Sequence, residues 1–157
     1  MEKEGPQEPA ITQDEILKLS DASFSTDNVC IVTGCGTGIG RATAIASAAN
    51  GLMTVGLDIN VEEGLKTQKL AREMGGQMIF LETDLSKDDE IEKAVSEAAK
   101  LGSVKYLANI AGLQHIDSVE NFPMEKYDLL QRIMLRSPFL LSKLVIPHIT
   151  KSSDGVG

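Results

Sequence analysis

Short apolar segments alternate along this chain with longer segments in which apolar residues recur every three or four positions. The short segments lie at residues 29–32, 52–57, 77–81 and 105–109, and the longer ones at 39–49, 61–74, 86–101 and 124–150. Short apolar runs predict buried strands, and the longer periodicity predicts helices. Strands that alternate with helices need right-handed crossovers, so the pattern predicts a doubly wound α/β fold with a parallel sheet covered on both faces.

The boundaries and faces of several helices can also be predicted. Segment 39–49 is rich in alanine, which allows close packing on a sheet, and Asn50-Gly51 is expected to end it. Segment 61–74 has its apolar positions at Leu65, Leu70, Ala71 and Met74.

The next helix is expected to open at Ser86, because Ser86 and Asp89 have the spacing of a capping box. Its predicted apolar face consists of Ile91, Ala94, Val95, Ala98 and Leu101. In the last helical segment, Pro138 is expected to cause a kink.

The N-terminal residues differ in character from the rest of the chain. Residues 1–10 are acidic and contain proline, which predicts a flexible arm, and residues 11–20 predict a short helix or an irregular lead-in that Thr12 or Asp14 could cap. We therefore divide the chain into an arm and lead-in at 1–27 and a single domain at 28–157.

Composition and charge exclude several classes of partner. The chain has 157 residues, of which 42% are hydrophobic, and its net charge is −8. The acidic balance argues against nucleic acid and against an anionic membrane surface. No apolar run is long enough to span a bilayer and the N-terminus is unlike a targeting peptide, so we expect a cytoplasmic protein.

The cysteines and histidines do not form a metal-binding pattern. Cys30 and Cys35 have no histidine near them, since the histidines are His115 and His148. We expect no metal, and small packing roles for both cysteines. Thiolate chemistry at Cys35, close to a helix N-terminus, is the alternative.

The residues that follow the first predicted strand indicate a phosphate site. Thr33-Gly34-Cys35-Gly36-Thr37-Gly38-Ile39-Gly40 turns from a strand into a helix. Glycines allow a tight turn and expose backbone N–H groups, and the helix N-terminus favours an anion. A glycine-rich loop without this role is the alternative.

Polar residues at the ends of the next strands extend that site. Asp58 follows the second strand, where its carboxylate can accept hydrogen bonds from both adenosine ribose hydroxyls and would repel a 2′-phosphate, which favours NAD over NADP. The alternative is that Asp58 only starts the next turn or caps a helix. After the third strand, Asp84 could accept from the adenine amino group while Leu85 packs on its ring.

These motifs, together with Asn109-Ile110-Ala111-Gly112 after the fourth strand, resemble the short-chain dehydrogenase/reductase family, whose domain is Rossmann-like. The resemblance covers residues 28–157 and implies an NAD-dependent oxidoreductase. It implies that the pyrophosphate is held by Gly34, Thr37, Gly38, Ile39 and Gly40. It implies ribose contacts from Asp58 and Ile59, adenine contacts from Asp84 and Leu85, and nicotinamide-side contacts from Asn109, Ala111 and Gly112.

Within the family, residues 111–116 and 119–123 resemble the D-3-hydroxybutyrate dehydrogenases. That resemblance implies a small hydroxy acid or ketone as substrate, 3-hydroxybutyrate or acetoacetate, with Gln114 binding its carboxylate through the amide N–H₂. The alternative for Gln114 is a solvated loop residue. His115 is expected to be structural.

The family's catalytic Tyr-x-x-x-Lys is absent, because Tyr106 is followed four residues later by Ile110 and Tyr127 by Gln131. We therefore expect an N-terminal portion of a longer enzyme, ending before a fifth strand. Met134 occupies the position at which the family usually has an asparagine of the proton relay, so the alternative is a noncatalytic or regulatory nucleotide-binding protein.

The resemblance also implies an assembly. The long helix through Leu141 and Val145 would form part of a subunit interface in a homo-oligomer, a dimer or a tetramer. Packing of that helix within its own subunit is the alternative.

Overall fold

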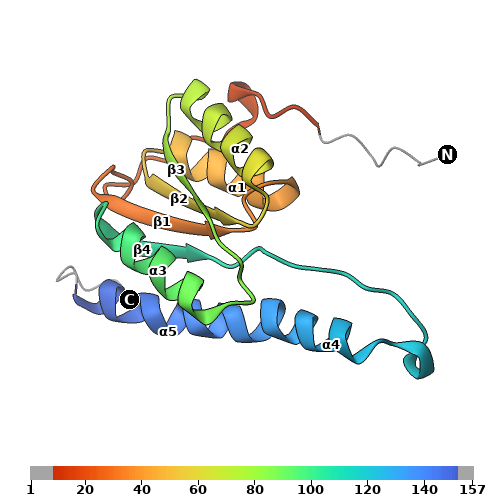
Figure 1. Cartoon of the computed structure of the whole chain (residues 1–157). Helices are drawn as coiled ribbons and strands as arrows, with labels where there is room; N and C mark the ends of the chain where they lie inside the picture. Colours follow the sequence, from red (N-terminus) through yellow and green to blue (C-terminus); the bar gives the residue numbers. More distant parts are fainter. Residues whose placement is uncertain (1–8, 152–157) are drawn as a thin grey trace.

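The structure, a computed structural model of the chain, describes residues 9–151. Its centre is a parallel sheet of the strands β1 (Asn28–Thr33), β2 (Met53–Asp58), β3 (Gln77–Glu82) and β4 (Ser103–Ala108). Within the described residues the strand order is β3-β2-β1-β4 (Figure 1). The chain moves outward from β1 in one direction to β2 and β3, and β4 then pairs on the other side of β1. The strand order therefore reverses between β1 and β4, where a doubly wound sheet has its ligand crevice.

The central strand β1 is the most enclosed element of the sheet. All its residues are buried, which explains why its middle part, Val29 to Val32, is continuously apolar and does not alternate. Its register against β2 pairs Val32 with Gly56 and Thr33 with Leu57. The register against β4 shifts between Val29 and Cys30. Thr33 and Asp58 therefore both lie at the carboxyl edge of the sheet.

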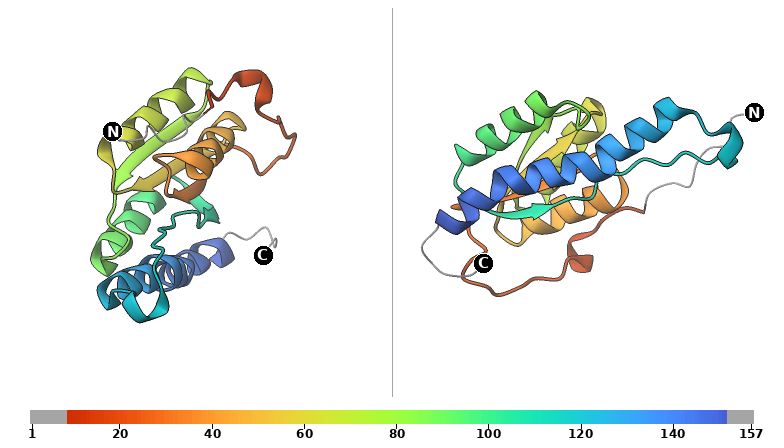
Figure 2. Two further views of the ribbon diagram at one scale, coloured as in Figure 1. Left: turned by 90° about the vertical axis from the view of Figure 1, so that its right-hand side faces the viewer. Right: turned by 90° about the horizontal axis from the view of Figure 1, so that it is seen from below.

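Helices cover both faces of the sheet, as the sequence predicts (Figure 2). On one face, α1 (Gly38–Ala49) and α2 (Val61–Glu73) pack around Cys30, Val32 and Met78. On the other, α3 (Asp88–Ala99) and α5 (Ser137–Lys151) enclose Val29, Ile31 and Val104. Among the described helices, none combines the length and apolar character of a membrane span.

Two details of the predicted helices are wrong. Leu65 is 50% exposed, and α2 instead buries Gly64, Thr67 and Ala71. The helix α3 does not open on a serine cap: its N-cap position is Lys87, without a side-chain cap bond, because Ser86 is engaged by Asp84. Four positions of the predicted apolar face of α3 are confirmed, since Ile91, Ala94, Val95 and Ala98 are buried. The fifth, Leu101, lies after the end of the helix and packs half-buried against the same core.

The long C-terminal helical segment is interrupted. Helix α4 (Met124–Gln131) passes through a π-helical turn at Arg132–Arg136 into α5. Pro138, where the sequence predicts a kink, lies in the first turn of α5, where a missing N–H costs least. The irregularity thus directly precedes the proline and α5, and it takes the form of a widened turn.

The lead-in packs along the edge of the domain. A single 3₁₀ turn at Gln13–Glu15 follows Thr12, whose N–H and hydroxyl donate to the Glu15 carboxylate. Further along, the N–H of Leu19 donates to the side chain of Asn50 at 2.7 Å. The predicted flexible arm falls mostly on residues 1–8, which lie outside the described residues.

Candidate functional site

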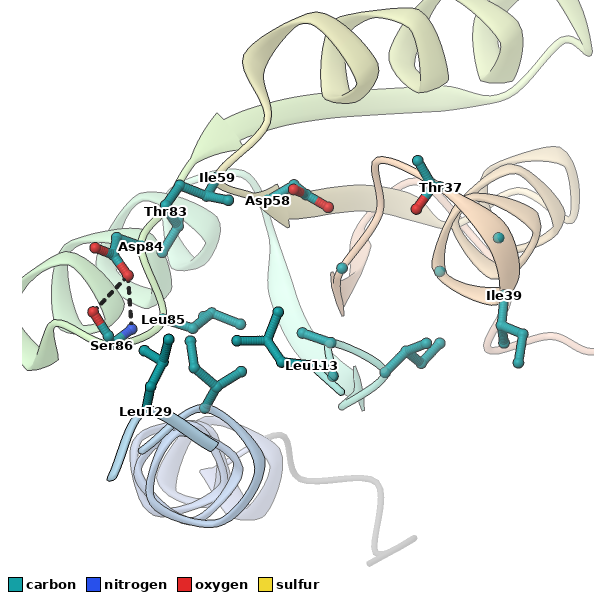
Figure 3. A pocket seen from close by; sticks show the side chains of 17 residues that line it. Thr37, Ile39, Asp58, Ile59, Thr83, Asp84, Leu85, Ser86, Leu113 and Leu129 are labelled. Atoms are coloured by element: carbon teal, nitrogen blue, oxygen red, sulfur yellow. Dashed lines mark hydrogen bonds between the residues drawn. The ribbon is translucent and has the colours of Figure 1, made fainter. Parts of the chain in front are cut away.

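A cleft of about 640 Å³ opens at the carboxyl edge of the sheet. It is formed by the segments that follow the four described strands, with α4 and the π-helical turn on one side (Figure 3). Its lining residues are Gly34, Thr37, Gly38, Ile39, Gly40, Asp58, Ile59, Thr83, Asp84, Leu85, Ser86, Ile110, Ala111, Gly112, Leu113, Leu129 and Ile133. The structure thus brings together every predicted cofactor residue except Asn109.

Each glycine of the first turn has its own structural reason. A Cβ on Gly34, where φ is +69°, would lie 2.8 Å from the Cα of Ala111, and a Cβ on Gly40 would overlap the carbonyl oxygen of Gly34. Gly38 has φ +53° and nothing within 4 Å of its Cβ position. Helix α1 begins at Gly38, so a helix N-terminus lies at the cleft, where the dipole and the backbone N–H groups favour an anion.

Asp58 lies between the two ends of the cleft, with Thr37 on one side and Asp84 on the other (Figure 3). Its carboxylate also supports the backbone: Oδ2 accepts from the Gly36 N–H at 2.8 Å, and Oδ1 accepts from the Asn60 N–H at 2.9 Å. The alternative that Asp58 caps a helix is wrong, because Asn60 is the N-cap of α2 and accepts from the Glu63 N–H.

The Asp84 end of the cleft is organised by a compact hydrogen-bonded turn. Oδ1 of Asp84 accepts from the Ser86 N–H at 2.9 Å and from the Ser86 hydroxyl at 2.7 Å (Figure 3). Burial alone would raise the pKa of Asp84, but the bonds from Ser86 and Lys87 outweigh it and hold the pKa below its usual value. Leu85 is buried in the wall of the cleft.

The segment after β4 is tied to β1 by a buried hydroxyl. Oγ1 of Thr33 accepts from the Ile110 N–H at 2.9 Å and from the Ala111 N–H at 3.1 Å. Asn109 and Gln114 are both exposed, and neither is among the lining residues. The Thr33 side chain therefore joins the carboxyl end of β1 to the segment that follows β4.

Two further residues near the nicotinamide-side prediction have defined surroundings. The ring of His115 packs edge-on against Phe122, with 5.1 Å between ring centres, and its Nε2 has no hydrogen-bond partner within residues 9–151. Met134, which is 53% exposed, has its Cε 3.8 Å from the Cβ position of Gly112. A methyl group thus lies beside Gly112.

Neither cysteine is available for thiolate chemistry. Both are free and buried. Burial, with a smaller effect from the charge of Asp58, raises the pKa of Cys35 to about 12, and burial raises the pKa of Cys30 to about 11. The thiolate alternative for Cys35 is therefore disfavoured. No cluster of three or more histidine, cysteine or acidic residues able to hold a metal occurs in the described part of the chain.

Sequence reasoning missed several residues of this site. Thr83 and Ser86 flank the predicted Asp84-Leu85, and Ile110 and Leu113 flank Ala111-Gly112. Their adjacency in the sequence to predicted site residues could have identified them. Leu129 and Ile133 had no such signal, because their place in the wall depends on how the last helical segment crosses the sheet.

Comparisons with known proteins match this arrangement. The model of the family described as short chain dehydrogenase matches residues 28–156, and the chain belongs to this family of oxidoreductases. Its members bind a nicotinamide cofactor. The matched range includes all the residues that line the cleft described above.

Several relatives are about one third identical to this chain over the residues that match. An uncharacterised oxidoreductase of Thermotoga maritima is 33% identical over 82% of this chain and 51% of its own. An NAD-dependent glycerol dehydrogenase of Listeria innocua is 33% identical over 86% of this chain and 53% of its own. The chain thus spans about half the length of the curated relatives it matches.

A solved structure supports the fold assignment. A metagenomic short-chain oxidoreductase in complex with NADP superimposes with a TM-score of 0.77 at 26% identity. The superposition covers 81% of this chain and 58% of that one.

Proposed function

We propose that residues 28–157 form the dinucleotide-binding part of an NAD-dependent dehydrogenase, with residues 1–27 as an arm and lead-in. The observation that carries the proposal is the Asp58 carboxylate in the cleft, between the glycine turn and Asp84. A carboxylate there accepts from two ribose hydroxyls and repels a 2′-phosphate, so NAD is preferred. The NADP of the solved relative belongs to that protein.

In this proposal each part of the cleft holds one part of the cofactor. Gly34, Thr37, Gly38, Ile39 and Gly40 hold the pyrophosphate at the start of α1. Asp58 and Ile59 bind the adenosine ribose, and Asp84 and Leu85 bind the adenine. Asn109, Ala111 and Gly112 adjoin the nicotinamide, which supplies the hydride chemistry when bound.

The proposed substrate is a small secondary alcohol, with 3-hydroxybutyrate and acetoacetate as the first pair to test. Gln114 follows the cleft-lining Gly112 and Leu113, and its side chain is exposed. An amide N–H₂ there can donate to a carboxylate without adding charge. The whole protein's activity would need the family's tyrosine and lysine, which are not among these 157 residues.

A second candidate is a noncatalytic nucleotide-binding or regulatory protein, and Met134 favours it. The methionine places a methyl group near Gly112 where the family usually has an amide, and a thioether binds water poorly. The test uses the whole protein with 3-hydroxybutyrate and NAD and follows NADH absorbance. Turnover by wild type supports the dehydrogenase. If wild type binds NAD without turnover and Met134→Asn restores turnover, the loss of the relay is supported.

We also propose a homo-oligomer, a dimer or tetramer, in the cytoplasm. Leu141 and Val145 pack within their own subunit, so the interface would use the exposed apolar residues of the same helical segment. These are Leu135, Phe139 and Ile146.

The proposed cytoplasmic location is supported by the two buried free thiols, because free thiols fit a reducing compartment.

The cofactor proposal is tested by calorimetric titration of this chain with NAD and with NADP. We expect NAD to bind about tenfold or more tightly than NADP, since a 2′-phosphate beside a carboxylate costs at least about 1.4 kcal/mol. Equal affinities would remove the ribose role of Asp58. If neither NAD nor NADP binds, the assignment of the cleft as a dinucleotide site is refuted.

A further inference from the structure

Arg41 is a buried cation at an unfavourable place. It lies in the first turn of α1 and is 5% exposed. The helix dipole disfavours a positive charge at a helix N-terminus, and burial of a guanidinium is costly unless its donors are used. Its position directly behind the glycine turn therefore calls for a specific set of partners.

The guanidinium of Arg41 joins the glycine turn to helix α2. Its Nε donates to Oγ1 of Thr67 at 3.0 Å, and its Nη2 donates to the carbonyl oxygen of Gly36 and pairs with Glu63. The Thr67 hydroxyl lies 2.9 Å from the carbonyl oxygen of Cys35 and donates to it. Two successive carbonyls of the turn are thus held by side chains, that of Gly36 by Arg41 of α1 and that of Cys35 by Thr67 of α2.

The same part of the turn is held from the sheet as well. The Gly36 N–H donates to Asp58, and the N–H groups of Gly34 and Cys35 approach the carbonyl oxygen of Leu57 at 2.8 and 3.3 Å. Cys35 and Gly36 are not among the residues that line the cleft, whereas Gly34, Thr37 and Gly38 are. The turn therefore has a back, Cys35 and Gly36, which hydrogen bonds from side chains and from the sheet fix in place. Its front, formed by Gly34, Thr37 and Gly38, faces the cleft.

From these contacts we propose that Arg41, held by Glu63 and Thr67, is a positioning residue for the cofactor. It fixes the glycine turn in its anion-binding form before the ligand arrives, so less conformational freedom is lost on binding. Arg41 acts through Gly36 rather than by touching the ligand. The inference rests on the proposed function, because it assumes that the pyrophosphate binds at this turn.

The test separates positioning from stability with a double variant. Arg41→Met/Glu63→Met removes both charges together, so no buried charge is left without its partner and the fold should persist. We expect an unchanged denaturation midpoint, faster amide hydrogen exchange at residues 34–40 alone, and NAD affinity about tenfold weaker by calorimetry. The control pair Arg136→Ala/Asp88→Ala, an exposed ion pair away from the turn, should alter neither exchange at 34–40 nor NAD affinity.

A conservative variant distinguishes geometry from charge. Arg41→Lys keeps the positive charge and can pair with Glu63, but it lacks the planar fork that reaches both Thr67 and Gly36. It should therefore resemble the double variant in exchange and in affinity. Wild-type values for either variant in both measurements would overturn the inference. If wild type itself fails to bind NAD, the proposed function falls, while the exchange data still report whether Arg41 orders the turn.

Discussion

The carboxylate of Asp58 accepts a hydrogen bond from the backbone N–H of Gly36 at 2.8 Å. This bond joins the end of β2 to the glycine turn after β1. It also explains the absence of a side chain at position 36, since a Cβ there would lie 2.9 Å from the same carboxylate oxygen. Asp58 thus supports the turn and also lines the cleft.

Asp58→Ala should weaken NAD binding more than NADP binding. The substitution removes the acceptor for the ribose hydroxyls, about a tenfold effect for NAD, and it also removes repulsion of the 2′-phosphate. Calorimetric titration of both cofactors measures the difference. The matched control is Glu82→Ala, because Glu82 pairs with Asp58 in register on β3, is exposed and does not line the cleft. Equal losses for NAD and NADP would exclude the ribose contact.

Thr33→Val should destabilise the protein, whereas Thr54→Val should not. The Thr33 hydroxyl accepts from two partly buried backbone N–H groups, so its loss leaves them without this partner and costs about 1–2 kcal/mol. Thr54 is fully buried, and its hydroxyl has no hydrogen-bond partner in the described structure. Urea denaturation measures both free energies of unfolding. A Thr54 variant as unstable as the Thr33 variant would contradict this interpretation.

Neither cysteine should react with a thiol reagent in the folded protein at pH 8. Burial raises the pKa of Cys35 to about 12 and that of Cys30 to about 11, so both thiols stay protonated, and the reagent also lacks access. Mass spectrometry after iodoacetamide treatment, with and without denaturant, provides the readout. Alkylation of native Cys35 at the rate of the denatured chain would restore it as a reactive thiol.

The ion pair between Asp88 and Arg136 should make stability depend on acid. A hydrogen bond from Arg136 holds the pKa of Asp88 below its ordinary value of 3.8. A carboxyl group whose pKa is lowered by folding stabilises the fold fully when the pH is above its pKa in the unfolded chain. This stabilisation is lost as the pH falls through its pKa in the folded protein. Wild type should therefore exceed Asp88→Asn in denaturation midpoint at pH 6, and the gap should close below about pH 3.8.

A control in the same helical turn isolates the effect of the ion pair. Asp89→Asn makes the same charge change in the first turn of α3, and Asp89 has no ion pair within the described residues. Its variant should differ less from wild type at pH 6. An equal difference for the two variants would assign the effect to the helix dipole.

Periodicity predicted the elements of the fold well but not every helix face. The core strand β1 and the face of α3 follow directly from their apolar residues, because those residues must leave water. In α2, Gly64 and Thr67 are buried in place of Leu65, because Phe80 approaches Gly64 and the Thr67 hydroxyl bonds the glycine turn. Neither neighbour can be inferred from the sequence of α2.

Some residues of the candidate site could likewise be predicted from the sequence, and others could not. The glycine turn, Asp58 and Asp84 could be predicted because backbone chemistry and strand ends fix their positions locally. Thr33 and Arg41 could not, since their partners are distant in sequence and their roles depend on which backbone groups the fold brings within reach. Ser86 was predicted as a helix cap, but a neighbouring carboxylate competes for its hydroxyl.

By itself the sequence determined the alternation of strands and helices, the glycine turn and the charged residues at strand ends, because these depend on local backbone and solvent preferences. Only the tertiary structure decided that Asp58 also holds Gly36, that Arg41 fixes the back of the turn and that Leu129 and Ile133 wall the cleft. Those relationships join segments far apart in the chain, and packing of the helices on the sheet sets their distances.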